Sequence, residues 1–322
     1  MSTFRRKLVA LARRVPVNRL IDGGVKTPDM FVHSREALEH ADRMFAAGRT
    51  DEAFEALRAL SIDEFGRLLF EVPAGLRSLQ AALPEMPSEQ SQREWAGTSG
   101  LPLLYQTCAF VRLIEAGFMR VTGRSLEGAR ILDYGCGWGR LLRLMYRFSP
   151  PEKIYGVDPW DRAIELGRRT RLLGHLAQTE YVPLELPFHE VKFDLVYAQS
   201  VWTHLSERTG RASLAAIRAR IMDDGLLVLT IRPVEYWSVH ADWPDGVTSV
   251  TMAARHREAG FAFMPHNPAG EGPQAPVDGE VVFGDASMSL DYVRKEWTQW
   301  ELAGYDLILT DPYQQALFLR PK

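Results

Sequence analysis

The sequence has few cysteines, no long apolar run and no large excess of charge. Its two cysteines, Cys108 and Cys136, are too few for a disulfide framework or a cysteine metal cage, which fits a reducing cytoplasm. No run approaches the roughly 18 apolar residues of a membrane span. A net charge of −3 argues against a surface built to bind nucleic acid. With 322 residues, 46% hydrophobic and 25% charged, the chain is expected to form one large folded domain or a domain with an appendage.

The amino terminus differs in charge from the rest of the chain. Residues 1–21 contain six basic residues and no acid, and the remaining 32 basic against 41 acidic residues give a balance of −9. Phe4, Leu8, Leu11 and Val15 recur at helical spacing, which is typical of an interfacial helix on anionic lipid and equally of a solvated first helix. The segment lacks the longer apolar stretch of a secretory signal. We therefore expect a cytoplasmic protein and leave peripheral membrane contact through residues 1–21 open.

The first third of the chain is mostly helical in pattern. Residues 33–60 have the apolar spacing of a helical hairpin broken at Gly48, and residues 102–122 continue as a further helix. The polar stretch 88–100 is predicted to be a loop that acts as a lid. We expect a helical N-terminal region over 1–125 and a second domain over 126–322.

From residue 130 onward, short apolar runs alternate with helical patterns, which indicates a parallel sheet covered on both faces. An insert at 232–286, rich in Pro, Gly, Trp and His, interrupts this order. The last two runs are close enough to form a hairpin with an antiparallel terminal strand. The predicted strands are 130–134, 153–157, 180–182, 193–198, 225–231, 306–310 and 315–319, and the predicted helices are 138–148, 161–173, 207–221 and 289–300.

The most informative segment runs from Ile131 to Arg140 as ILDYGCGWGR, a strand that passes through three alternate glycines into a helix. Glycines at a strand-to-helix turn let the backbone approach a ligand, and the helix amino terminus offers free N–H donors. The dinucleotide fingerprint requires a glycine where this chain has Arg140, and the Lys-Ser/Thr ending of a phosphate loop is absent. The turn therefore indicates a different nucleotide-like ligand.

These residues resemble the class I S-adenosylmethionine-dependent methyltransferases, whose first motif is a strand ending in Asp/Glu-x-Gly-x-Gly-x-Gly. The resemblance continues through Asp158 at the end of the second predicted strand, 19 residues past Gly139, through 193–200, and through 221–227. It implies an α/β fold with a Rossmann-like seven-stranded sheet, and S-adenosylmethionine as the cofactor. By the resemblance, Asp158 accepts hydrogen bonds from the ribose, Trp160 stacks on adenine and Glu185 replaces the acid that contacts the adenine amine. The other cofactor-binding residues that it implies are Asp133, Gly135, Cys136, Gly137, Gly139 and Gln199.

Methyl transfer from a sulfonium is an in-line displacement, and a base is needed only for an acceptor such as an alcohol. Enzymes that methylate amino groups of adenine or glutamine carry Asn/Asp-Pro-Pro-Tyr/Phe after the fourth strand, whereas this chain has Ala-Gln-Ser-Val at 198–201. The run Asp-Pro-Tyr at 311–313 is interpreted as an ordinary turn. His204 follows the fourth strand, and histidine is the side chain best suited to take a proton near neutral pH. We predict that His204 is the catalytic base, with loop orientation as the alternative.

The acceptor pocket is expected beneath the insert, because ligands of open α/β sheets bind outside the carboxyl ends of the strands. No metal is predicted, since the insert histidines lack the short helical spacing of a zinc site. Aromatic and polar side chains together suit a sugar-like or aromatic acceptor, although a small insert core would have the same composition. The predicted acceptor residues are Trp95, Trp202, Tyr236, Trp237 and His240.

We therefore predict an S-adenosylmethionine-dependent methyltransferase that methylates oxygen on a sugar, a glycan or another small molecule, with no nucleic-acid partner. Methylation of a small-molecule amine or a macromolecule remains open. So does a non-catalytic scaffold that binds S-adenosylmethionine, because Met-Asp-Asp at 222–224 departs from the family pattern. A nicotinamide-dependent oxidoreductase is disfavoured by Arg140. The sequence does not predict the oligomeric state.

Overall fold

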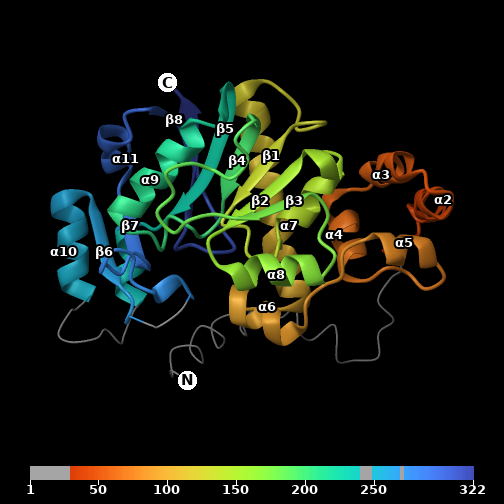
Figure 1. Cartoon of the computed structure of the whole chain (residues 1–322), viewed down its shortest axis with the longest axis horizontal. Coiled ribbons are helices and arrows are strands. Elements are labelled where there is room, and N and C mark those ends of the chain that lie inside the picture. Colours follow the sequence, from red (N-terminus) through yellow and green to blue (C-terminus); the bar gives the residue numbers. More distant parts are fainter. Residues whose placement is uncertain (1–29, 240–248, 269–271) are drawn as a thin grey trace.

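A computed structural model describes residues 30–239, 249–268 and 272–322 (Figure 1). The basic segment 1–21 and His240 lie outside these ranges, so the proposals made for them remain predictions. None of the described helices is long and apolar enough to cross a membrane.

A seven-stranded mixed sheet forms the centre of the described part of the chain. Its strand order is β3-β2-β1-β4-β5-β9-β8, and the last strand, β9, is antiparallel to both of its neighbours. This confirms the predicted α/β sheet with an antiparallel terminal strand. The strands are β1 (Ile131–Tyr134), β2 (Ile154–Asp158), β3 (His175–Gln178), β4 (Phe193–Ala198), β5 (Ile221–Ile231), β8 (Trp300–Leu307) and β9 (Gln315–Pro321).

Two strands were predicted at the wrong place. The strand expected over 306–310 is β8, which begins earlier, at Trp300, and ends at Leu307, and the third strand is also displaced. The sequence pattern favoured 180–182, but β3 occupies His175–Gln178 at the edge of the sheet, paired in parallel with β2. An edge strand has one neighbour, and the side chains of β3 are half-buried or exposed. It therefore lacks the apolar run by which the central strands are recognised.

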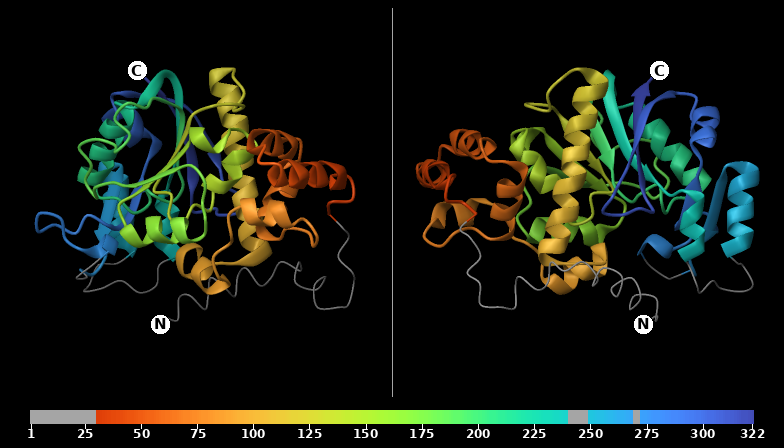
Figure 2. Two further views of the ribbon diagram at one scale, coloured as in Figure 1. Left: turned by 45° about the vertical axis from the view of Figure 1, so that its right-hand side comes forward. Right: turned by 180° about the vertical axis from the view of Figure 1, so that it is seen from behind.

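The sheet is covered on both faces, because successive side chains along each strand point to opposite sides. On one face, Ile131, Leu195 and Phe318 pack with the long helix α7 (Gly100–Thr122), which crosses the sheet in Figure 2. A Cβ at Gly117 of α7 would lie 1.9 Å from the ring of Phe318, so this position is glycine because the helix and the sheet are in contact. On the other face, Leu132, Val196 and Leu317 and their neighbours pack against α9 (Glu207–Arg218) and α11 (Leu290–Glu296).

The region before α7 is helical, as predicted, and includes the hairpin broken at Gly48. The predicted loop 88–100 is wrong in part, because it contains helix α6. Ser88 caps this helix by accepting the backbone N–H of Ser91, and Gly97 ends it with a φ of +73°. The boundary at residue 125 remains a prediction. The helices are α2 (Arg35–Ala46), α3 (Thr50–Arg58), α4 (Ile62–Phe70), α5 (Arg77–Ala82) and α6 (Glu89–Ala96).

Between the strands, the helix expected over 138–148 is reduced to the 3₁₀ segment η2 (Leu142–Arg147), and α8 (Asp161–Arg169) follows β2. A further 3₁₀ turn, η3 (Pro151–Lys153), precedes β2.

The insert after β5 forms its own small layer beside the carboxyl end of the sheet (Figure 1). Its strands β6 and β7 pair in antiparallel fashion, and Trp237, Met252 and Met264 form a separate apolar core. Two β7 amides, those of Gly284 and Ala286, donate to the carbonyls of His204 and Thr203 at 2.9 Å. The insert is thereby fixed above the loop that follows β4. Its elements are η4 (Val234–Val239), α10 (Ser249–Ala259), β6 (Phe261–Pro265), η5 (Gly272–Gln274) and β7 (Gly284–Met288).

Candidate functional site

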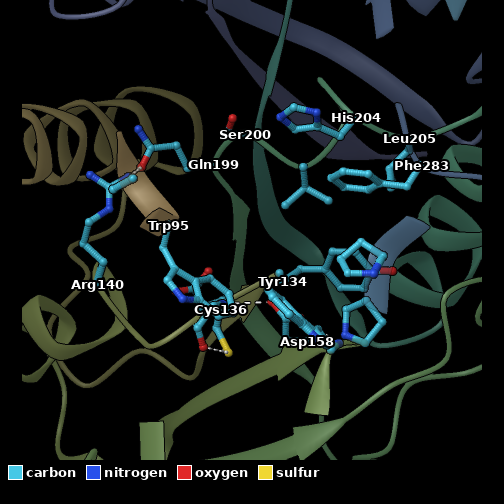
Figure 3. Close-up of a pocket in the computed structure, with 18 of the residues that line it drawn as sticks. Trp95, Tyr134, Cys136, Arg140, Asp158, Gln199, Ser200, His204, Leu205 and Phe283 are labelled. Carbon is cyan, nitrogen blue, oxygen red and sulfur yellow. Dashed lines mark hydrogen bonds between the residues drawn. The ribbon is translucent and has the colours of Figure 1, made fainter. Parts of the chain in front are cut away.

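A cavity of about 1000 Å³ opens at the carboxyl ends of the parallel strands. On one side it is lined by the glycine turn, the end of β2 and Trp95 of α6; on the other it is lined by the loop after β4, the end of β5 and the insert. Figure 3 shows this arrangement, with Asp158 and Cys136 below and His204 and Phe283 above. The cavity thus has two sides, which we call the glycine-turn side and the insert side.

The glycine turn has the backbone conformation that its sequence predicts. Gly135, Gly137 and Gly139 all have a positive φ, of +76°, +52° and +80°. A Cβ at Gly135 would lie 2.4 Å from Val201, and one at Gly139 would lie 2.2 Å from Leu172. Gly135, Cys136 and Gly137 line the cavity, whereas Gly139 does not and instead allows close packing.

Asp158 is the carboxylate of the glycine-turn side. Its oxygens accept hydrogen bonds from the backbone N–H groups of Gly137 and Trp160, each at 2.9 Å. These bonds hold the glycine turn against the end of β2. Its side chain is open to the cavity but lies deep in the protein. Burial therefore raises the pKa of Asp158 to about 6, although the two backbone hydrogen bonds act in the opposite direction.

Asp133 and Arg140 form a buried polar floor beneath the turn. Burial raises the pKa of Asp133 to about 8, against the charge of Arg140, and lowers the pKa of Arg140 to about 10, so the arginine remains charged at pH 7. Arg140 donates to Gln199 and, at 3.1 Å, to the hydroxyl of Thr107. Gln199 and Asp133 both line the cavity, and their contact with the cofactor stays a prediction. Burial also raises the pKa of Cys136 well above its usual value, so its thiol is protonated.

Two tryptophans from distant parts of the chain close the glycine-turn side. The rings of Trp95 and Trp160 stack with centroids 4.7 Å apart and an angle of 27°. Trp95 also lies beside Gly137, where a Cβ would be 3.7 Å from its ring. Helix α6 therefore lies against the glycine turn through Trp95, and its role as a lid stays a prediction. Trp95 belongs to the glycine-turn side and not to the predicted acceptor pocket.

Glu185 does not line this cavity. It is exposed, pairs with His189 at 3.3 Å and borders a smaller neighbouring hollow. The loop after β3 instead brings Glu180 and Tyr181 to the glycine-turn side. The assignment of Glu185 to the adenine amine followed from the misplaced third strand, and Glu180, two residues past the end of β3, is the acid at that place.

His204 lies on the insert side of the cavity, and both of its ring nitrogens are engaged. Nδ1 lies 2.7 Å from the carbonyl of Gly284 and Nε2 lies 3.2 Å from Arg232. Since a guanidinium only donates, Nε2 accepts, and the proton on Nδ1 donates to Gly284. Burial and then the charge of Arg232 lower the pKa of His204 to about 3. His204 is therefore neutral, and its lone pair is occupied.

A second set of polar side chains surrounds Asp285 of β7. Its carboxylate accepts from Arg232, from the hydroxyl of Tyr236 at 2.7 Å and from Nε2 of His266 at 3.0 Å. His204, His266 and Asp285 have ligand atoms within 4.8 Å of one another, which is close enough for a metal ion. The guanidinium of Arg232 already supplies the positive charge there, because it contacts both Asp285 and His204. This donor set therefore does not fit an additional cation.

Two of the predicted acceptor residues lie in the core, and a third is nearly buried and contacts Asp285. Trp202 is 1% exposed and packs beside Tyr134, and Trp237 is fully buried and donates to Ser287 at 2.6 Å. Tyr236 is 7% exposed and holds Asp285. The aromatic insert is thus mainly a core, which was the alternative interpretation of its composition.

Several cavity residues were not predicted from the sequence. Ser200 follows β4 with a φ of +59°, a strained conformation for a residue with a side chain, and its N–H donates to Thr230 at 2.7 Å. No local pattern in the sequence identifies these residues, because they come together only in the folded chain. The unpredicted residues that line the cavity include Arg140, Ser200, Arg232, His266, Phe283, Asp311 and Gln314.

Residues 131–225 match a family model described as a methyltransferase domain. No curated protein matches the sequence. Among solved structures, a Rickettsia typhi protein in complex with AdoHcy is 24% identical, with 38% of this chain and 26% of that chain covered and a TM-score of 0.32. This chain thus spans about a quarter of that protein.

Two other solved structures are similar over most of their length. An S-adenosylmethionine-dependent methyltransferase from Clostridium acetobutylicum is 10% identical, covering 72% of this chain and 96% of that chain, with a TM-score of 0.44. The magnesium protoporphyrin IX methyltransferase of Synechocystis with bound SAH is 13% identical, covering 72% and 93%, with a TM-score of 0.43.

The matched segment runs from β1 into β5 and contains the glycine turn, Asp158 and the loop that carries Ser200. The sheet around it has the Rossmann-like strand order with the last strand reversed. The matched segment and the glycine-turn side of the cavity therefore largely coincide, and this part of the chain is similar to a methyltransferase domain.

Proposed function

We propose that this chain transfers the methyl group of S-adenosylmethionine to a hydroxyl group of a sugar, a glycan or another small molecule, in the cytoplasm. The observation that carries the proposal is that one continuous cavity of about 1000 Å³ joins the glycine-turn side to the polar insert side. A donor and an acceptor held on these two sides would meet at the end of β4, next to Ser200.

The glycine-turn side fits S-adenosylmethionine. The Asp158 carboxylate has about four acceptor sites and uses two for backbone N–H groups, so acceptor capacity is left for the two ribose hydroxyls. The indole of Trp160 offers an apolar face to adenine. Arg140, a buried cation beside Gln199, suits the carboxylate of the methionine part.

The insert side fits a polar acceptor. It presents hydroxyl, amide and imidazole groups, and the rings of His204 and Phe283 lie nearly parallel, with centroids 5.0 Å apart. Gln314 contacts the hydroxyl of Ser200 at 3.4 Å and Asp311 at 2.8 Å, which fixes the wall near the end of β4. Side chains held in this way can orient a hydroxyl-bearing molecule by hydrogen bonds.

When bound, S-adenosylmethionine supplies an electrophilic methyl group on a positively charged sulfur. The residues of this chain contribute mainly by placement, because an in-line displacement accelerates when the two reacting atoms are held close and aligned. Asp158, the glycine turn and the stacked tryptophans hold the donor side and limit the entry of water. The loop after β4 and the insert hold the acceptor.

The affinity for S-adenosylmethionine is expected to depend on pH through Asp158. The pKa of this buried acid is raised to about 6, and only its ionised form accepts both ribose hydrogen bonds well. Affinity should therefore be constant above about pH 7 and fall by up to roughly tenfold for each pH unit below 6. Calorimetric titration between pH 5 and 8 measures this. Asp158→Asn should bind more weakly with no such dependence, and an equally steep fall in that variant would contradict the assignment.

Removing the indole of Trp95 is expected to weaken cofactor binding. Trp95→Ala takes away the ring that stacks on Trp160 and covers Gly137. The loss should be about 1 kcal/mol, or roughly fivefold to tenfold in Kd, and Trp95→Phe should recover part of it. Tyr105→Ala removes an aromatic side chain that is 67% exposed on α7 and serves as the control. Equal affinities for Trp95→Ala and the wild type would show that α6 does not cover the bound cofactor.

The proposed function is tested by incubating the full chain with S-adenosylmethionine and fractionated small-molecule and glycan extracts. Mass spectrometry should detect S-adenosylhomocysteine together with an acceptor heavier by one methylene unit. Binding of S-adenosylmethionine with no demethylated product in any fraction would instead favour a scaffold that binds the donor without catalysis.

One observation favours an amine as the second candidate acceptor. Asp311 of the Asp-Pro-Tyr turn lines the cavity, so this turn is part of the site, and its carboxylate could pair with an ammonium group. With S-adenosylmethionine that carries a ¹³C-labelled methyl group, a product labelled on nitrogen instead of oxygen would support this candidate. The Asp311→Asn variant should then no longer form that product.

A further inference from the structure

His266 and Asp285 form a carboxylate–imidazole pair that the sequence does not reveal. Met264 of β6 pairs with Asp285 of β7, and His266 follows β6 by one residue, so the small sheet of the insert brings the two side chains together. Nε2 of His266 lies 3.0 Å from Asp285. The backbone N–H of His266 donates to the carbonyl of Phe283 at 3.1 Å, and the two rings meet edge to face, which fixes the imidazole.

The carboxylate of this pair is itself fixed and ionised. Arg232 and the hydroxyl of Tyr236 donate to Oδ1, while His266 contacts Oδ2. Burial alone would raise the pKa of Asp285. The hydrogen bond from His266 and the charge of Arg232 outweigh burial and hold that pKa far below its usual range.

This arrangement determines which nitrogen of His266 carries the proton. An ionised carboxylate only accepts hydrogen bonds, so Nε2 of the neutral ring is the donor and Nδ1 keeps a free lone pair. Among the described residues Nδ1 has no hydrogen-bond partner, and the side chain lines the cavity with 28% of its surface exposed. His204 differs, because Gly284 and Arg232 occupy both of its nitrogens.

We propose that His266, oriented by Asp285, is the catalytic base that takes the proton of the acceptor hydroxyl. This inference rests on the proposed function and moves the base role from His204 to its neighbour. His204, whose ring centroid lies 6.2 Å from that of His266, then forms part of the acceptor wall and helps to position Arg232.

The proton balance of the step is complete without a further reactant. The hydroxyl oxygen forms a bond to the methyl carbon, and the bond between that carbon and the sulfonium sulfur breaks, leaving its electron pair on sulfur. The hydroxyl proton moves to Nδ1 of His266. The resulting imidazolium is stabilised by Asp285 and later loses the proton to solvent, to which the ring is partly open.

The charged groups near His266 balance one another. The charged or titratable groups around the ring are Asp285 from β7, Arg232 from the end of β5, Tyr236 from η4 and His204 from the loop after β4. Asp285 and Arg232 carry opposite charges and form an ion pair. His204 stays neutral, so these groups place no unbalanced positive charge beside the ring of His266.

The kinetic test compares His266→Gln with the wild type. The substrates are S-adenosylmethionine with a ¹³C-labelled methyl group and the extract fraction that the wild type methylates on oxygen. The variant should lose roughly a hundredfold or more in kcat/KM at pH 7.5. Its Kd for S-adenosylmethionine should stay within about twofold, since the base does not hold the donor. Added imidazole should restore part of the activity of His266→Ala. His40→Gln, an exposed histidine of α2, is the control and should behave as the wild type.

A second measurement determines which ring nitrogen of His266 carries the proton, and it requires no acceptor. Side-chain ¹⁵N NMR should show that neutral His266 carries its proton on Nε2, whereas His204 carries its proton on Nδ1. A proton on Nδ1 of His266, or kcat/KM of His266→Gln within about threefold of the wild type, would overturn the proposal. The two claims fail separately: no label on oxygen with the wild type contradicts the proposed function, whereas O-methylation that survives His266→Gln contradicts only the base.

Discussion

Replacing Asp158 by alanine is expected to abolish measurable binding of S-adenosylmethionine. The ribose of S-adenosylmethionine would lose its two charge-assisted hydrogen bonds to the carboxylate. Together they are worth about 3 kcal/mol or more, which is at least roughly a hundredfold in Kd. The same substitution frees the backbone N–H groups of Gly137 and Trp160, so the glycine turn also loses its support. Calorimetric titration with S-adenosylmethionine measures the effect.

Asp161→Ala is a suitable control for this experiment. Asp161 is an exposed acid three residues further along, at the start of α8, and it does not line the cavity. Both variants remove one carboxylate, from the end of β2 and from the start of α8, so the general effect of the lost charge should be similar. If both variants bound as the wild type does, Asp158 would not be the ribose ligand.

Alanine at Gly135 is expected to weaken cofactor binding by roughly tenfold or more. The residue has a φ of +76°, where an L side chain costs about 1–2 kcal/mol, and its Cβ would lie 2.4 Å from Val201. The turn must shift to remove this contact, and the shift would displace the backbone that lines the cavity. The Kd for S-adenosylmethionine and the thermal midpoint should be measured together.

Gly128→Ala separates backbone strain from loss of the site. Gly128 has a similar φ of +67°, but the nearest atom to its Cβ would be Nζ of Lys153 at 3.8 Å, and it lies outside the cavity. Both variants should therefore lower the thermal midpoint, and only Gly135→Ala should change the Kd. A similar change in Kd for both would mean that general destabilisation, and not the shape of the turn, controls binding.

The parts of the site that the sequence predicted are those carried by contiguous residues. The glycine turn and Asp158 follow buried central strands whose apolar runs are easily recognised, and the spacing between them is set by one helical connection. Glu185 was assigned wrongly because β3 is a short edge strand without an apolar run. Helix α6 was missed although Ser88 and Gly97 are ordinary cap residues, because its eight residues contain few apolar side chains.

The insert side could not be predicted, because it is assembled from residues far apart in the sequence. Asp285 lies 53 residues from Arg232 and 19 from His266, and only the pairing of β6 with β7 brings them together. The aromatic residues of the sequence did not predict which side chains line the insert side. Trp202 and Trp237 pack in the core, and a tryptophan in a core and one in a pocket have the same sequence signal.

The central claim is that one cavity brings S-adenosylmethionine and a hydroxyl-bearing acceptor together at the end of β4. Its most direct test is ¹³C NMR of the products formed by the full chain from methyl-labelled S-adenosylmethionine and a glycan or metabolite extract. The account predicts a new signal from a methyl group bound to oxygen, present with the wild type and absent with Asp158→Ala. Label that remains on the donor, or that appears only on nitrogen, would contradict it.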